Sequence, residues 1–298
     1  MNLKIGNTPL IELTKEFSLS NGARIFAKLE FENAGGSIKD RVALAIIEDA
    51  EEKGALTKGG LVVEATSGNT GIGLAIVAKA KGYKSVIFMP ENSAPSISER
   101  IRAFGGEVRF TPANEGMRGS VERAKAFVEN TPNCYYADQF NNPVCALVHT
   151  KTTGVEIWEQ TQGKVDIFVA GVGTGGTLTG VSRCLKEKKP AVLAVGVEPA
   201  SSPLLSQGKS GRHGIQGIGA NFIPSVFDRS VCDEVITATD EEALYWAEQL
   251  YQKAGLTVGL SSGAAFSACL KLAARKENAD KIIVTVFQFD GNRYEMKR

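Results

Sequence analysis

The feature that most constrains the fold is a regular alternation of short apolar runs with segments of helical periodicity. Leu61–Ala65, Ser85–Met89 and Val165–Ala170 have the length and apolarity of buried strands. Turns rich in Gly, Pro or hydroxyl side chains follow them, and helical segments come next. Strands that alternate with helices are typical of parallel sheets covered by helices. We therefore predict an α/β fold with mainly parallel sheets in three-layer α/β/α domains.

The length of the chain, 298 residues, predicts two domains or one large α/β unit. No repeat, low-complexity tract or Pro-rich linker marks a boundary, so a division must fall in loops such as 139–143. Hydrophobic residues make up 43% and charged residues 22%, which is typical of a globular protein with a real core. The formal net charge of +1 gives no indication of nucleic acid or a membrane surface as partner.

Cysteine and histidine usage gives no indication of a metal site. The five cysteines are scattered and form no Cys-x-x-Cys pair, which is typical of reduced thiols in a cytoplasmic protein. His149 and His213 are the only histidines, and neither lies near a cysteine cluster, so we expect both to be structural. No apolar signal core or 18-residue apolar run occurs, so we expect the chain to stay in the cytoplasm.

Lys39 follows a pair of glycines, Gly35 and Gly36, and precedes a helical apolar stripe. We expect Ser37 to cap this helix, which would place Lys39 in its first turn. A cation is disfavoured there by the helix dipole, so its pKa should be lowered, and a partly neutral amine is a nucleophile. The alternative is an ordinary solvated lysine beside Asp40 and Arg41.

Residues Thr66–Gly71 form a strand-to-helix turn with two glycines, an amide and three hydroxyls. Backbone N–H groups at a helix start bind anions, and the hydroxyls add donors. The turn has no lysine and so is not a nucleotide P-loop. It suits a small carboxylate, although a capped turn with glycines kept for packing is equally compatible with the sequence.

Two further turns carry chemistry. Gly171–Thr177 has several glycines and two threonine hydroxyls, in the manner of a phosphate cradle. It also matches the Gly-x-Gly-x-x-Gly fingerprint of dinucleotide-binding folds, and Glu198 lies at about the distance of a ribose-binding acid, so that reading stays open. Gly259–Ala265 opens a helix with two serines, of which one either caps the helix or bonds a ring nitrogen.

Together these turns resemble the cysteine synthase (O-acetylserine sulfhydrylase) and cystathionine β-synthase family of tryptophan-synthase-β-like pyridoxal phosphate enzymes. The resemblance covers nearly the whole chain. The motifs that carry it are Gly6–Leu10, Gly36–Arg41, Ala65–Gly71, Asp138–Pro143, Thr152–Trp158, Gly171–Gly180, Gln216–Ala220, Leu260–Ala265 and Gly291–Tyr294.

The resemblance implies a role for each matching residue. Lys39 would be the catalytic Schiff-base lysine that also moves the substrate proton. The other cofactor-binding residues would be Asn69, the phosphate loop Gly173, Thr174, Gly175, Gly176 and Thr177, and Ser261 at the pyridine nitrogen. The substrate-binding residues would be Thr66, Ser67, Thr70 and Gln139 at the carboxylate, with Gly217 and Asn221 at the mouth of the site.

The resemblance also implies the architecture and the reaction. It implies a smaller mobile domain over residues 33–143 and a larger domain over 1–32 and 144–298, with pyridoxal 5′-phosphate in the cleft between them. The reaction would be β-replacement on an amino acid through an α-aminoacrylate, by default cysteine synthesis from O-acetylserine and sulfide. The partners would be a small amino acid and sulfide or a thiol, and the enzyme would be a homodimer.

Some positions depart from the commonest cysteine synthase pattern. Ala34 replaces a usual proline, Asn221 replaces a usual glycine, the loop 93–97 looks about two residues longer, and Phe287–Asp290 replaces a Pro- and Ser-containing turn. They keep open an alternative that uses cysteine or serine and forms cystathionine, serine or lanthionine or releases sulfide. A non-catalytic amino-acid-binding protein is a more distant alternative, which has no need of Lys39.

Overall fold

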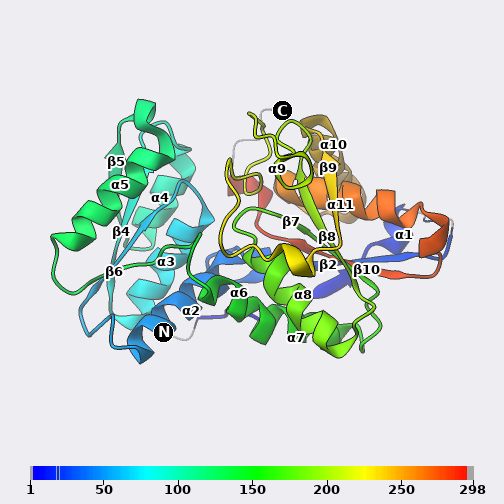
Figure 1. Cartoon of the computed structure of the whole chain (residues 1–298), viewed down its shortest axis with the longest axis horizontal. Coiled ribbons are helices and arrows are strands. Elements are labelled where there is room, and N and C mark those ends of the chain that lie inside the picture. Colours follow the sequence, from blue (N-terminus) through cyan, green and yellow to red (C-terminus); the bar gives the residue numbers. More distant parts are fainter. Residues whose placement is uncertain (1–2, 18, 20, 294–298) are drawn as a thin grey trace. The chain divides into compact units, whose positions relative to one another are not determined.

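The computed structural model describes residues 3–17, 19 and 21–293, and Tyr294 of the last motif lies outside them. The chain forms two compact units (Figure 1). The smaller unit is built mainly from Asn33–Cys145, and the larger unit mainly from Gly6–Glu32 and Ala146–Asn292.

The smaller unit contains a four-stranded, entirely parallel sheet in the order β5-β4-β3-β6. Its strands are β3 (Leu61–Ala65), β4 (Lys84–Pro90), β5 (Glu107–Thr111) and β6 (Cys134–Tyr136). Its helices are α2 (Lys39–Glu52), α3 (Asn69–Lys81), α4 (Pro95–Ala103) and α5 (Gly116–Glu129). Alternate side chains of β3 and β4, such as Val63 and Phe88, pack under α5, and the opposite face lies against α3.

One expectation for this unit is wrong. The segment 93–97, expected to be a loop, already contains the first turn of α4, which begins at Pro95. Proline is favoured at this position because its missing N–H would have no partner inside the helix and its fixed φ suits a helix start.

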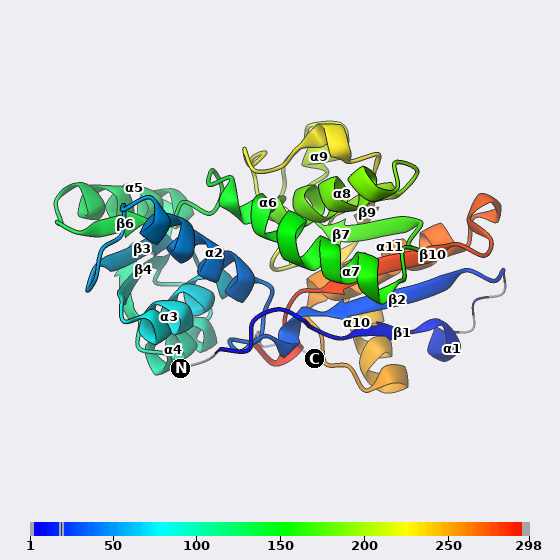
Figure 2. The same cartoon turned by 90° about the horizontal axis from the view of Figure 1, so that it is seen from below.

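The larger unit contains a six-stranded sheet in the order β1-β2-β10-β7-β8-β9, in which only β1 runs antiparallel. Its strands are β1 (Leu10–Glu12), β2 (Arg24–Leu29), β7 (Ile167–Gly171), β8 (Leu193–Pro199), β9 (Glu234–Ala238) and β10 (Ile282–Phe287). Its longer helices are α7 (Gly154–Gln160), α8 (Gly176–Lys188), α10 (Asp240–Ala254) and α11 (Leu260–Ala273). Figure 2 shows α7 and α8 on one side of this sheet and α10 on the other.

Short helices complete the chain. They are α1 (Thr14–Phe17), α6 (Val144–Val148) and α9 (Leu204–Gln207), together with a π-helix over His149–Thr153. The 3-10 turns are Glu30–Glu32, Ala113–Glu115, Arg229–Val231, Lys276–Asn278 and Gly291–Arg293. Within residues 3–17, 19 and 21–293, no helix is long and apolar enough to cross a membrane.

The topology confirms the predicted α/β class with mainly parallel sheets and decides where the loops meet. Parallel neighbours end at the same edge of a sheet, and ligands of such folds bind outside that edge. In the smaller unit this edge carries the turn after β3 and the segment after β6. In the larger unit it carries the turns after β7 and β8.

Candidate functional site

The turn between β3 and α3 presents the candidate anion-binding groups of the smaller unit. Gly68 is the residue before α3, and Asn69 and Thr70 begin the helix and are buried. Thr66 is also buried, and its Oγ1 accepts a hydrogen bond from the N–H of Gly68 at 3.2 Å. Ser67 alone is exposed. The turn therefore combines a helix N-terminus, the positive end of the helix dipole, with hydroxyls that the fold has already oriented.

Gln139 joins this turn from a distant part of the sequence. Its backbone follows β6, the parallel neighbour of β3, so both segments leave the sheet at one edge. The hydroxyl of Thr70 donates to Oε1 of Gln139 at 2.5 Å, and both side chains are buried. The structure thus brings together the predicted carboxylate-site residues Thr66, Thr70 and Gln139, with Asn69 beside them.

Lys39 is the first residue of α2, as predicted, but its local surroundings differ from the expectation. Ile38, and not Ser37, is the cap residue, although the Lys39 N–H still donates to Ser37 Oγ at 3.3 Å. Asp40 and Arg41 are buried, which is at odds with an ordinary solvated turn. Asp40 accepts the Gly35 N–H at 2.6 Å and so fixes the glycine pair ahead of the lysine.

Close packing of α2 on α3 places Lys39 beside the anion-binding turn. A Cβ built on Gly73 of α3 would lie 2.9 Å from the Lys39 carbonyl oxygen, so only glycine permits this approach. Burial lowers the pKa of Lys39, against the opposite influence of Cys145 and Glu64. The pKa direction is the one predicted, but its main cause is desolvation, where the sequence argument relied on the helix dipole.

The turn after β7 in the larger unit has the form of a phosphate cradle. Gly175 precedes α8 with φ 81°, a left-handed conformation, and a Cβ there would lie 2.5 Å from Cβ of Phe227. Thr174 Oγ1 accepts the N–H of Gly176 at 3.4 Å. The backbone therefore turns sharply at Gly175 and presents the N-terminus of α8, the positive end of its dipole.

Three segments of the larger unit converge beside this loop. A Cβ on Gly173 would collide with the carbonyl oxygen of Gly217, and a Cβ on Gly217 would lie 3.6 Å from Oγ of Ser261. The ring of Phe289 lies beside the same segments, because it packs against Gly217 and Gly259. The loop Gly173–Thr177, the loop with Gly217 and the start of α11 thus lie together, as the predicted roles require.

Ser261 supplies the test of whether this place fits a pyridine ring. Its side chain is 1% exposed, and its Oγ has no hydrogen-bond partner among the residues that the structure describes. A buried hydroxyl without a partner is costly, and a ligand that accepts or donates there relieves the cost. Ser262 Oγ is in the same state, so the structure offers two candidate hydroxyls where the sequence argument selected one. The residues present fit pyridoxal phosphate.

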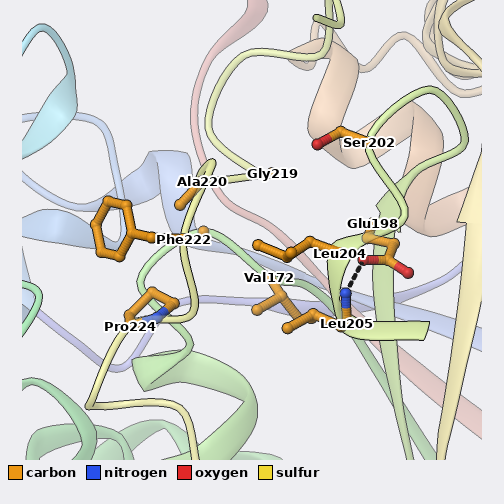
Figure 3. Close-up of a pocket in the computed structure, with 10 residues that line it drawn as sticks. Val172, Glu198, Ser202, Leu204, Leu205, Gly219, Ala220, Phe222 and Pro224 are labelled. Carbon is orange, nitrogen blue, oxygen red and sulfur yellow. Dashed lines mark hydrogen bonds between the residues drawn. The ribbon is translucent and has the colours of Figure 1, made fainter. Parts of the chain in front are cut away.

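A cavity in the larger unit lies beside the start of the loop Gly173–Thr177 (Figure 3). Its lining includes Gly173, Gly219, Ala220 and Phe222, while Asn221 itself is exposed. Glu198, the acid that kept the dinucleotide reading open, accepts the N–H groups of Leu205 and Ser206 at 2.7 and 3.0 Å. Its carboxylate is therefore already used to hold the start of α9.

Two residues near these groups were missed by the sequence argument. His149, expected to be structural, is buried in a π-helix with Nε2 3.5 Å from Thr177 Oγ1 and Nδ1 2.9 Å from Thr153 Oγ1. Glu64, inside the apolar run of β3, contacts the segment of Gln139. An acid inside a buried strand was a signal that could have been used. Within the described ranges no cluster of three or more His, Cys, Asp or Glu could hold a metal.

Comparison with known proteins gives concordant findings. A family model described as pyridoxal-phosphate dependent enzyme matches residues 1–288. Cysteine synthase B of Campylobacter jejuni is 47% identical over 290 residues, which are 97% of this chain and 94% of that protein. A cysteine synthase structure from Entamoeba histolytica has a TM-score of 0.94 at 40% identity, covering 99% of this chain and 88% of that one. A hydrogen sulfide-producing enzyme from Fusobacterium nucleatum has a TM-score of 0.90 at 40% identity, covering 98% and 97%.

Proposed function

The chain belongs to the pyridoxal-phosphate dependent enzymes, and from this premise we propose that it makes cysteine from O-acetylserine and sulfide. The observation that carries the proposal is the half-buried lysine at the start of α2, whose pKa is lowered by desolvation and whose backbone packs against the helix that follows a turn suited to a small carboxylate. The identity to cysteine synthases over nearly the whole chain supports the choice of substrates.

We propose a cofactor-binding role for each of several residues. Lys39 would bind it covalently, and Asn69 would bond its ring oxygen. The N–H groups and hydroxyls of Gly173–Thr177 would hold its phosphate, because a helix start with glycines admits an anion to the backbone. Ser261 would bond the ring nitrogen through its otherwise unpartnered hydroxyl. A neutral serine leaves that nitrogen unprotonated, which restrains the ring as an electron sink.

When bound, pyridoxal phosphate supplies a ring that withdraws electrons from the α-carbon of an amino acid. Lys39 Nζ would take the α-proton, since its lowered pKa leaves part of the amine neutral and able to act as a base. Thr66, Ser67, Thr70 and Gln139 would bind the substrate carboxylate and so fix the direction of the α-proton toward the base. Sulfide would then add at the β-carbon, from which acetate has left.

A second candidate function is sulfide release from cysteine, with exchange of the sulfur for another group. Asn221 favours it, because the side chain is exposed at the loop that lines the cavity of Figure 3. An amide there could bond an added water or a larger thiol. The structural likeness to a hydrogen sulfide-producing enzyme also supports this candidate.

Side-by-side rates decide between the two candidates. Purified enzyme is given O-acetylserine with sulfide, cysteine alone, and serine or cysteine with homocysteine, at equal donor concentrations. Our proposal expects the first rate to be the highest, and it is wrong if sulfide release or cystathionine formation is faster. If one of these is faster and Asn221→Gly shifts the ratio toward cysteine synthesis, Asn221 is responsible.

Three further properties belong to the proposal. The smaller unit would move when a substrate carboxylate binds the turn Thr66–Gly71, and small-angle scattering with and without substrate tests this. The enzyme would be a homodimer, for which sedimentation gives the mass. It would work in the cytoplasm, which agrees with five free cysteines, and fractionation of cells tests the location.

A further inference from the structure

Glu64 is a buried acid with no assigned role, on β3, one of the two inner strands of the sheet in the smaller unit (Figure 1). Its side chain is 1% exposed and lies in a strand whose other buried members are Val62, Val63 and Ala65. A carboxyl group in such a place costs stability unless its oxygens are bonded. Its position therefore needs a reason beyond packing.

Both oxygens of Glu64 accept backbone hydrogen bonds. Oε1 accepts the N–H of Ala65 at 2.8 Å, and Oε2 accepts the N–H of Gln139 at 3.0 Å. Gln139 in turn accepts the hydroxyl proton of Thr70 at 2.5 Å. A continuous chain of bonds thus runs from Glu64 through Gln139 to the first turn of α3.

The backbone just before Gln139 makes this support necessary. Asp138 has φ 49°, a left-handed conformation that costs energy for any residue other than glycine and persists where its surroundings enforce it. The chain turns at Asp138 on leaving β6, and the next N–H points to Glu64. Glu64 therefore holds the turn that aims the side chain of Gln139 at Thr70.

The charges around Glu64 come from several elements. Lys39 of α2 favours its ionised form, and Asp138 after β6 opposes it. Tyr136 of β6 and Cys145 of α6 face the same interior, where burial and, to a smaller extent, the charge of an ionised Glu64 raise the pKa of both. Burial dominates and raises the pKa of Glu64 to about 8, so the group is mainly protonated at neutral pH. A neutral Glu64 does not repel an anion bound at the neighbouring turn.

We propose that Glu64 is a positioning residue of the substrate-carboxylate site, which holds Gln139 in place against Thr70. This inference rests on the proposed function only in taking the α-carboxylate of an amino acid as the ligand of that turn. Glu64 acts through Gln139 and does not touch the substrate.

The test compares two amines that differ in the carboxylate. L-Alanine carries the α-carboxylate but no leaving group, and ethylamine lacks the carboxylate; the absorption of the bound cofactor reports the binding of either. Glu64→Gln replaces one carboxyl oxygen with an amide NH2 group, which cannot accept a hydrogen bond from the backbone N–H of Ala65 or Gln139. We expect this variant to bind L-alanine roughly tenfold more weakly than the wild type, which is the effect of about one lost hydrogen bond. Its affinity for ethylamine should stay within about twofold of the wild-type value. The proposal is overturned if the variant binds both amines equally more weakly, or if its affinity for both is unchanged.

A matched control and a second variant complete the design. Glu30 is equally buried, lies in the larger unit and bonds Thr8, so Glu30→Gln should leave the preference for L-alanine over ethylamine unchanged. If Glu64→Gln does not fold, Glu64→Asp takes its place. Glu64→Gln should add little to Gln139→Ala, because Glu64 acts through the side chain of Gln139, and fully additive effects would overturn the proposal.

The outcome is independent of the proposed reaction. If wild-type enzyme fails to make cysteine but binds L-alanine in preference to ethylamine, and Glu64→Gln removes that preference, the proposed substrates are wrong and the role of Glu64 stands. In turnover, the same variant should raise KM for the amino acid more than it lowers kcat.

Discussion

At the scale of single residues, the proposed role of Lys39 as the base predicts the pH dependence of the reaction. Its pKa is lowered by burial, so its amine becomes neutral at a lower pH than that of a free lysine, about 10.4. Because Lys39 would be free of the cofactor only after the substrate has bound, we expect kcat to rise with pH and to level off below that value. Lys39→Arg keeps the charge but cannot lose its proton, and should lower turnover about 10²–10⁴-fold at every pH. Full activity of this variant would exclude Lys39 as the base.

Ser261 and Ser262 offer a matched pair of buried hydroxyls. Ser261→Ala removes a hydroxyl that meets no partner in the described protein, so the cofactor-free protein should lose no more than about 1 kcal/mol or gain slightly in stability. The same change should weaken the binding of the cofactor and shift its absorption spectrum, since Ser261 would bond the nitrogen of its ring. Ser262→Ala should leave the spectrum unchanged. The reverse pattern would transfer the role to Ser262.

At the scale of elements, the start of α8 depends on glycine geometry. Gly175→Val would place a branched side chain at φ 81° and within 2.5 Å of Phe227. We expect the purified variant to retain much less cofactor, measured by absorption against protein concentration. Gly208→Val is the control, because Gly208 has φ 71° but no atom within 4 Å of a Cβ. Equal cofactor loss in both variants would assign the effect to backbone strain alone.

At the scale of the whole molecule, the pH dependence of folding stability reports the buried acid. The pKa of Glu64 is about 8 in the folded protein and about 4.3 in an unfolded chain. Between these values the folded state holds a proton that the unfolded state has lost, so stability falls as pH rises. Glu64→Gln cannot lose this proton. The denaturant midpoint should therefore fall further between pH 5 and pH 9 in the wild type than in the variant. An equal fall in the two proteins would contradict a raised pKa of Glu64.

The sequence alone determined the fold class and most of the candidate site. The alternation of apolar runs and helical segments indicated parallel sheets, and glycine and hydroxyl side chains after the strands marked the loops that end at the sheet edge. These signals are local, since a turn or a helix start needs particular residues at fixed spacing. Lys39 could be placed at a helix start for the same reason.

Only the tertiary structure decided which distant groups meet. The approach of Gly73 to Lys39, the bond from Thr70 to Gln139 and the contact of Gly217 with Ser261 join segments far apart in sequence, and no local pattern encodes such pairings. The same is true of Glu64. In the sequence it is one acid in an apolar run, and its role arises because β6 pairs with β3 and brings the N–H of Gln139 to its carboxyl. Burial, which sets the pKa of Lys39 and of Glu64, is likewise a property of the packed chain.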